Sequence, residues 1–82
     1  MTVATVGNDW SAGLALTSDT QFDCLVGAVA LTWTSGGPAG TADDAMHLDA
    51  GNRDSVIVPS GYTAYWRNAA ADAPVKLSYR DA

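Results

Sequence analysis

Glutamate is absent from this sequence, and its 82 residues include one cysteine, one histidine and four basic residues. The single cysteine, Cys24, excludes a disulfide within the chain. The small number of basic residues argues against nucleic acid as a partner, because phosphate binding needs a basic surface. No run approaches about 18 uninterrupted apolar residues, and the N-terminus has neither a basic nor an apolar segment, so we expect no membrane partner and no signal peptide. These absences favour synthesis in a reducing cytoplasm.

The remaining composition is typical of one small folded domain that spans residues 1–82. Hydrophobic residues make up 48% of the chain and include three Trp, three Tyr and one Phe, whereas disordered chains are poor in aromatic residues. A domain of this size has a thin core and, without disulfides, commonly gains stability from a partner. Charge is uneven as well, since residues 1–54 carry seven Asp and one Arg, but residues 55–82 carry three basic residues and two Asp.

Short runs of alternating β-branched and aromatic residues, separated by Gly, Pro, Asn and Asp, predict an all-β fold without a helix. The spacing of about ten residues predicts an antiparallel β-sandwich or small barrel of about seven or eight short strands. Residues 1–12 form either an N-terminal arm or an edge strand. The strands are expected at 2–6, 14–17, 21–26, 29–34, 45–48, 55–59, 62–68 and 75–80, and the core is expected to include Phe22, Leu31, Trp33, Val56, Val58, Trp66, Leu77 and Tyr79.

None of the reactive side chains forms a recognisable catalytic or metal-binding motif. His47 is expected on a strand surface, and Cys24 is expected to be a small buried hydrophobe, unless the fold joins the two as a nucleophilic pair. The acidic residues Asp43, Asp44, Asp49 and Asp54 lack the spacing of an EF-hand, so solvated turns are favoured, although a cation site in the region 43–54 stays open. We therefore predict no enzyme activity, no cofactor and no metal.

The most informative segment is the expected hairpin of residues 62–68 and 75–80. Its alternation predicts an apolar inner face, and an outer face that carries Tyr65, Arg67, Lys76 and Arg80. Tyr and Arg are enriched at the centres of protein interfaces, so this face is a candidate docking surface, with a plain solvated strand face as the alternative. Trp10, in the polar stretch GNDWSAG, is a second candidate, because its indole either closes one end of the core or contacts a partner.

Residues 21–82 resemble the small β-sandwich decoration, or cement, proteins of tailed-bacteriophage capsids. The resemblance lies in the order of features: LTWTSGG followed by a Pro/Gly/Ala loop, and then MHLDAGNRDSVIVPSGYTAYWRNAAADAPVKLSYR. It implies a virion protein on the outside of the capsid, made in the host cytoplasm, without catalysis. Its partners would be the major capsid protein and further copies of itself. No functional residue is carried over, because no invariant motif is available to match.

Two other functions remain open at this stage. One is a free-standing ligand-binding β-module, for instance one that recognises carbohydrate through an exposed aromatic side chain. The other is a component of the tail or of a head fibre. A small hydrolase is disfavoured because the catalytic set is missing.

Overall fold

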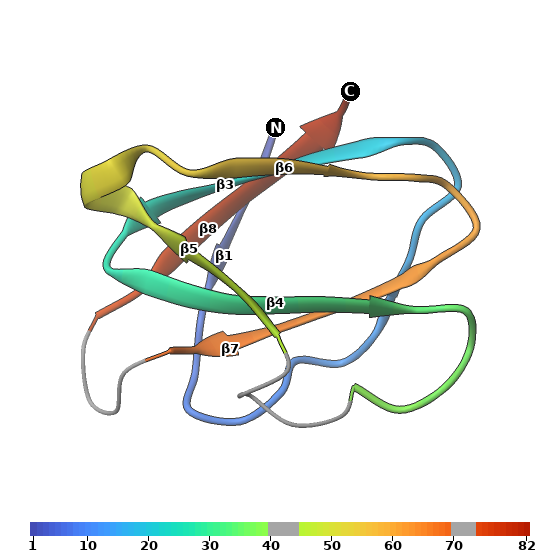
Figure 1. Ribbon diagram of the computed structural model, residues 1–82, viewed down its shortest axis with the longest axis horizontal. Coiled ribbons are helices and arrows are strands. Elements are labelled where there is room, and N and C mark those ends of the chain that lie inside the picture. The colour runs from blue at the N-terminus through green and yellow to red at the C-terminus, as the bar shows by residue number, and fades with distance from the viewer. Residues whose placement is uncertain (40–44, 70–73) are drawn as a thin grey trace.

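Eight antiparallel strands form two four-stranded sheets that face each other, as the computed structural model shows (Figure 1). The structure describes residues 1–39, 45–69 and 74–82. The strands are β1 (Thr2–Thr5), β2 (Leu14–Ala15), β3 (Thr20–Val26), β4 (Ala28–Thr34), β5 (Met46–Asp49), β6 (Ser55–Val58), β7 (Thr63–Asn68) and β8 (Lys76–Asp81), with a short 3-10 helix, η2 (Ala50–Asn52), after β5.

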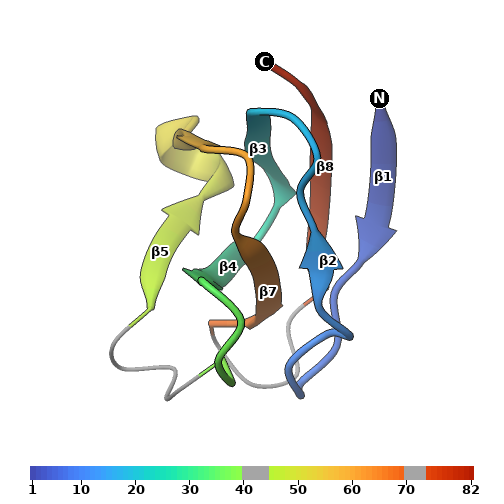
Figure 2. The same cartoon turned by 90° about the vertical axis from the view of Figure 1, so that its right-hand side faces the viewer.

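The order of the strands defines the topology. Sheet A has the order β1-β8-β3-β6, and sheet B has the order β2-β7-β4-β5. The antiparallel pairs β1–β8, β2–β7, β3–β6 and β4–β5 are those of one long hairpin, which is rolled up so that its strands alternate between two layers (Figure 2). Eight strands in this double-sheet arrangement are a jelly roll.

The prediction of an all-β antiparallel fold is confirmed, and the choice between sandwich and barrel is settled. The two sheets share no ladder, so the fold is a sandwich rather than a closed barrel. β1 is the outer strand of sheet A, which makes residues 2–5 an edge strand. Within the described ranges, no helix has the length and apolar character needed to cross a membrane.

The predicted hairpin of residues 62–68 and 75–80 is wrong. β7 pairs with β2 and β4 in sheet B, whereas β8 pairs with β1 and β3 in sheet A. Both strands exist and their inward alternation is as expected, because Ala64, Trp66 and Leu77 are buried. The chain therefore crosses from one sheet to the other between β7 and β8, and the residues that connect them include 70–73, which lie outside the described residues.

The core between the sheets is centred on three aromatic rings. Phe22 and Tyr79 are partners across β3 and β8 and stack at 5.7 Å, and Trp66 of sheet B packs on both, at 6.1 and 5.5 Å between ring centroids. All eight predicted core residues lie in this core or pack against it. Five of them are buried, namely Phe22, Leu31, Val58, Trp66 and Leu77, while Trp33, Val56 and Tyr79 are partly buried.

Two apolar residues that share the inward alternation of their strands are nevertheless exposed. The pairing register of β3 shifts between Cys24 and Val26, and this bulge leaves Val26 43% exposed although it shares the alternation of Phe22 and Cys24. Tyr62 precedes β7 and is 38% exposed. Gly27, with φ of 75°, is the single residue between β3 and β4 and turns the chain from sheet A into sheet B.

Candidate protein-docking surface

The structure divides the sequence-predicted docking residues between the two outer faces of the sandwich. Tyr65 and Arg67 have the outward alternation of β7, and Trp10 lies against Arg67, so these three residues meet on sheet B. Lys76 and Arg80 are exposed and have the outward alternation of β8, which belongs to sheet A. The single basic surface expected from a hairpin is therefore not formed. We refer to Trp10, Tyr65 and Arg67 as the Trp10–Arg67 patch.

The segment between β1 and β2 places Trp10 beside β7. Its backbone follows β7 as an irregular edge, because the amide of Asn68 donates to the carbonyl of Gly7 and the amide of Ser11 donates to the carbonyl of Trp66, at 2.8 and 2.9 Å. The hydroxyl of Ser11 accepts the amide N–H of Trp66 at 3.1 Å, in place of a backbone carbonyl. Trp10 is held next to Arg67 by these bonds on either side of it.

Gly13 allows this segment to approach the sheet closely. A Cβ atom at Gly13 would lie 2.6 Å from the methyl group of Thr63 and 3.1 Å from the ring of Tyr65. A larger residue would push the segment away from β7, and Trp10 with it. Gly13, the last residue of GNDWSAG, therefore has a packing role.

Arg67 lies over the indole of Trp10. Its guanidinium carbon is 5.7 Å from the ring centroid, within the range of a cation–π contact. Such contacts contribute about 0.5–1 kcal/mol at exposed sites and about 2 kcal/mol when water is excluded. Both side chains are half-buried, so the contact holds the guanidinium in place. Docking would then cost Arg67 less side-chain conformational entropy.

Tyr65 is tied to the loop that follows β4. Its hydroxyl donates to the carbonyl of Gly37 at 3.4 Å, and the hydroxyl of Thr34 donates to the same carbonyl at 2.7 Å. Thr32 is the register partner of Tyr65 on β4. The start of the loop is thereby anchored over the outer face of sheet B, next to the aromatic side of the Trp10–Arg67 patch.

A small residue lies beside Arg67 in the sheet. Ala30 is the register partner of Arg67 on one side and of His47 on the other, and it is fully buried. The three residues form a row across β7, β4 and β5 on the outer face of sheet B. His47 is exposed, as the sequence predicts. The outer face of sheet B thus presents one guanidinium and one imidazole on either side of an alanine.

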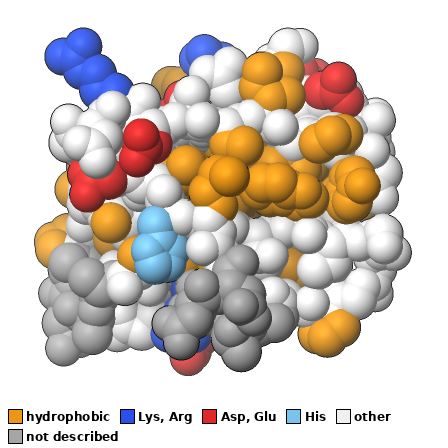
Figure 3. All heavy atoms as spheres, in the orientation of Figure 1, with side chains coloured by type: hydrophobic (Ala, Val, Ile, Leu, Met, Phe, Trp, Pro, Cys, Tyr) orange, Lys and Arg blue, Asp and Glu red, His pale blue; other side chains and the backbone are white. Residues whose placement is uncertain are grey.

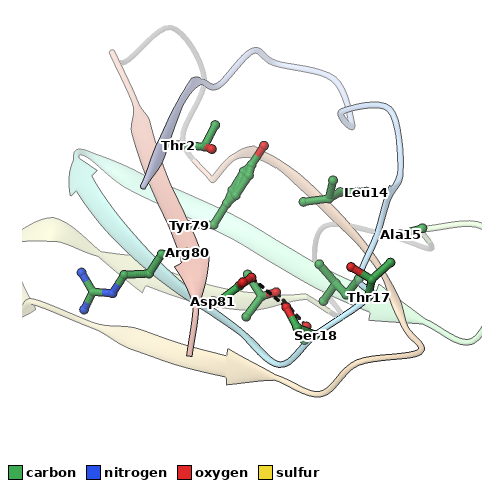
Figure 4. Close-up of a pocket in the computed structure, with 10 residues that line it drawn as sticks. Thr2, Leu14, Ala15, Thr17, Ser18, Tyr79, Arg80 and Asp81 are labelled. Carbon is green, nitrogen blue, oxygen red and sulfur yellow. Dashed lines mark hydrogen bonds between the residues drawn. The ribbon is translucent and has the colours of Figure 1, made fainter.

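A hollow of about 180 Å³ opens on the side of the sandwich between β2 and the β1–β8 pair (Figure 4). Tyr79 lies between Thr2 and Leu14, and the hydroxyl of Ser18 donates to the carboxylate of Asp81 at 2.7 Å at one end. Arg80 points away from these side chains (Figure 4). The hollow is therefore lined by hydroxyl groups and by an apolar wall that includes Leu14 and Leu16.

Apolar side chains gather on another side of the molecule, in a band over the region between β6 and β4 (Figure 3). β5 pairs with β4 only from Ala28 to Leu31, and a hollow of about 360 Å³ lies where that pairing ends. Its lining includes Trp33, Met46 and Ala45. Because Ala45 directly follows residues outside the described ranges, we assign no function to this hollow.

The other reactive side chains do not converge. Cys24 is buried between the sheets, where its thiol donates to the carbonyls of Val26 and Gly27 at 3.5 and 3.3 Å, whereas His47 is on the outer face of sheet B. The two are therefore not brought together as a nucleophilic pair. Burial raises the pKa of the Cys24 thiol above its usual value, with smaller opposing contributions from backbone hydrogen bonds.

Two of the four acidic residues considered as a cation site shape a turn. Asp49 accepts the amide of Gly51 at 2.7 Å at the start of η2, and Asp54 accepts the amide of Asp49 at 3.0 Å. Asp43 and Asp44 lie outside the described residues. Within the ranges that the structure describes, no three His, Cys, Asp or Glu side chains are grouped closely enough to hold a metal ion.

Sequence reasoning missed Ser11, Gly13 and Ala30, which position the patch without contributing a charge or an aromatic ring to it. The signal for Gly13 was present, because it directly precedes the strand expected at 14–17, and a glycine beside a strand is one sign of a close backbone approach. Comparison with known proteins adds no identity: no protein-family model matches the chain, and no curated protein is detectably similar to it.

Proposed function

We propose that this chain is a non-enzymatic virion structural protein, which binds the outer surface of a tailed-bacteriophage capsid and stabilises contacts between major capsid protein subunits. The observation that carries the proposal is the Trp10–Arg67 patch on the outer face of sheet B. Trp, Tyr and Arg are the residue types that dominate binding energy at protein interfaces. The sequence resemblance to capsid decoration proteins supplies the identity of the partner.

The patch is organised for docking before a partner arrives. The Trp10 ring holds the guanidinium of Arg67, and the hydroxyl of Tyr65 is bonded to Gly37. Few rotamers are then lost on binding, and this favours affinity from a small contact area. A strand face that only keeps a sheet soluble would not need its side chains to be held in fixed positions.

Modest affinity suffices for a protein that binds a shell in many copies. A ligand that binds only the assembled state stabilises it by RT ln(1 + [L]/Kd) at each site, and a closed symmetric shell repeats the site many times. The jelly-roll fold is compatible with this role, since it occurs in viral capsid and lectin domains, but the fold alone does not define a function. Lys76 and Arg80 are on the opposite sheet, so the proposal assigns the contact to Trp10, Tyr65 and Arg67 and not to these two residues.

A free-standing ligand-binding module is the second candidate, favoured by the hollow beside Tyr79. Its hydroxyl-lined wall and the Asp81 carboxylate suit a polar ligand such as a sugar. The ratio of this chain to a shell protein separates the two functions. A decoration protein occurs at a fixed ratio in purified particles, whereas a ligand module need not occur in them at all.

The test of the proposed function compares particles with and without this chain. Virions are purified from a wild-type phage and from one in which the gene is interrupted, and infectivity is measured after heating and after osmotic shock. We expect the particles that lack the chain to lose infectivity at a lower temperature and at a smaller osmotic step. Equal survival of both particles would contradict a stabilising role.

A further inference from the structure

We propose that Arg67, resting on Trp10, receives a single carboxylate side chain from the partner protein. This inference rests on the proposed function and deepens it, because it names the chemistry of the contact. It commits the partner to an Asp or Glu that projects toward the outer face of sheet B.

Arg67 differs in its surroundings from the other basic residues. Arg53, Lys76 and Arg80 are exposed, whereas Arg67 is half-buried. Among the described residues, Nε of Arg67 is the one buried side-chain nitrogen or oxygen without a hydrogen-bond partner. A buried donor left without an acceptor is costly, so its presence in a folded protein calls for an explanation. The explanation we propose is that a partner protein brings the hydrogen-bond acceptor.

The geometry of the patch suits a carboxylate. A guanidinium offers five N–H donors in a planar fork that matches the two oxygens of a carboxylate, and stacking on an aromatic ring leaves the edge of the fork available. The Trp10 ring holds Arg67 in this way. A carboxylate that meets the exposed part of the guanidinium would find it already oriented.

The charge of the molecule selects a single carboxylate over a polyanion. The chain has a net charge of −5, and Asp9, the residue before Trp10, is exposed. A row of phosphates would be repelled by a chain of this net negative charge. One acidic side chain on an otherwise uncharged protein surface avoids that repulsion.

The first experiment uses the free protein and needs no particle. The Nε–Hε resonance of Arg67 and the indole N–H resonance of Trp10 are followed by NMR during titration with sodium acetate, against sodium chloride at equal ionic strength. We expect acetate to move both resonances along a saturating curve, while the Nε–Hε resonance of Arg80 moves no more than in chloride. If acetate and chloride have equal effects on Arg67, the inference is wrong.

A second arm asks whether the chain supplies the carboxylate itself. Asp43, Asp44 and Asp72, which lie outside the described residues, are replaced by Asn one at a time. We expect the Arg67 resonances to be unchanged in all three variants. A large shift in any one of them would mean that an internal carboxylate occupies Arg67, and this would overturn the inference.

The third arm measures binding to particles that lack the chain. Arg67→Gln should weaken binding by about 30-fold or more, the lower end expected when one partner of a buried charge pair is truncated. Arg67→Lys should restore only part of this loss, since an ammonium cannot form the bidentate contact. The matched control Arg80→Gln should change binding by less than about threefold, as is usual for an exposed charge.

The outcomes separate this inference from the proposed function. Binding that is strong but equally insensitive to Arg67→Gln and Arg80→Gln would refute the role of Arg67 and leave the capsid function standing. Absence of binding by the wild-type chain would refute the capsid function, and the acetate titration would then decide the inference about Arg67 by itself. Circular dichroism and melting curves of each variant exclude loss of fold as the cause.

Discussion

At the scale of single residues, Gly27 is the position where backbone geometry is most demanding. Its φ of 75° is in the left-handed region, and a Cβ there would lie 2.6 Å from the carbonyl oxygen of Pro74. We expect Gly27→Ala to lower the free energy of unfolding by about 1–3 kcal/mol, because a strained backbone and a contact with the main chain add together. Thermal unfolding measures this, at about 4–8 °C per kcal/mol for a domain of this size.

Gly37 provides the matched control for that substitution. A Cβ at Gly37 would meet nothing within 4 Å, and its φ is not in the left-handed region. Gly37→Ala should therefore change the free energy of unfolding by less than about 0.5 kcal/mol. If the two alanine variants melted at the same temperature, the account of the β3–β4 corner would be wrong.

Cys24 gives a prediction about pH. Burial raises the pKa of its thiol, so at neutral pH the native protein holds less thiolate than a free cysteine does. We expect a thiol reagent such as DTNB to label the native chain much more slowly than the urea-unfolded chain. The neutral thiol also favours the folded state, so stability should fall as the pH rises through the ordinary pKa of cysteine and the unfolded thiol ionises. Labelling at equal rates in both states would contradict the burial of Cys24.

Much of the residue-scale picture could be predicted from alternation alone. Phe22, Leu31, Val58, Trp66 and Leu77 were placed in the core because apolar residues recur at every second position of a strand with one buried face. Val26 could not be placed correctly, because a bulge shifts the alternation by one residue and leaves no mark in the sequence. The same limit applies to Ser11, whose hydroxyl replaces a backbone acceptor.

At the scale of strands, the sequence predicted which segments form strands, but it did not predict which strands pair with each other. All eight expected strands overlap the observed ones, because turn residues separate them clearly. Neighbours in sequence, however, pair in one case alone among the described strands, β4 with β5. Local patterns fix which residues face inward, whereas a jelly roll joins strands far apart in the chain. The error for residues 62–68 and 75–80 follows from this, and so does the division of the predicted basic surface.

Cross-linking can test the corrected pairing. Thr5 and Lys76 are register partners on β1 and β8, and both are exposed, so cysteines at these positions should form a disulfide readily. The background is Cys24→Ala, which removes the native thiol. Oxidised and reduced samples are compared by mass spectrometry after proteolysis.

The control pair is the one that a β7–β8 hairpin would favour. Arg67 and Lys76 would face each other in such a hairpin, but they lie on the outer faces of two sheets stacked about 10 Å apart. Cysteines at 67 and 76 should therefore not cross-link within one native chain. Efficient formation of the 67–76 disulfide together with failure of the 5–76 disulfide would show that the sheet order is wrong.

At the scale of the whole molecule, the two sheets are held together by a core with few large residues. Phe22 is fully buried and contacts Tyr79 in its own sheet and Trp66 in the other. We expect Phe22→Ala to cost about 3–5 kcal/mol, a large part of the roughly 5–15 kcal/mol that stabilises a typical domain. Phe22→Leu should cost much less, since it leaves a smaller void. Urea unfolding followed by Trp fluorescence measures both, and equal, small effects would contradict the central position of this ring.

The whole molecule also has two unlike outer faces, and this bears directly on its function. The Trp10–Arg67 patch is on sheet B, while Lys76 and Arg80 are on sheet A together with Asp23, whose carboxylate accepts hydrogen bonds from Gln21. A restrained cation next to two aromatic rings is therefore found on one face only among the described residues. If the chain binds a shell through one face, we expect that face to be sheet B.

The position of the chain on a purified particle tests the central claim most directly. Electron cryomicroscopy of virions that carry this chain, with a symmetric reconstruction of the head, would locate it. We predict density for the sandwich on the outside of the capsid, at a fixed ratio to the major capsid protein, with the outer face of sheet B and the Arg67 side chain toward the shell. Density in the tail, inside the head or nowhere on the particle would contradict the proposed function.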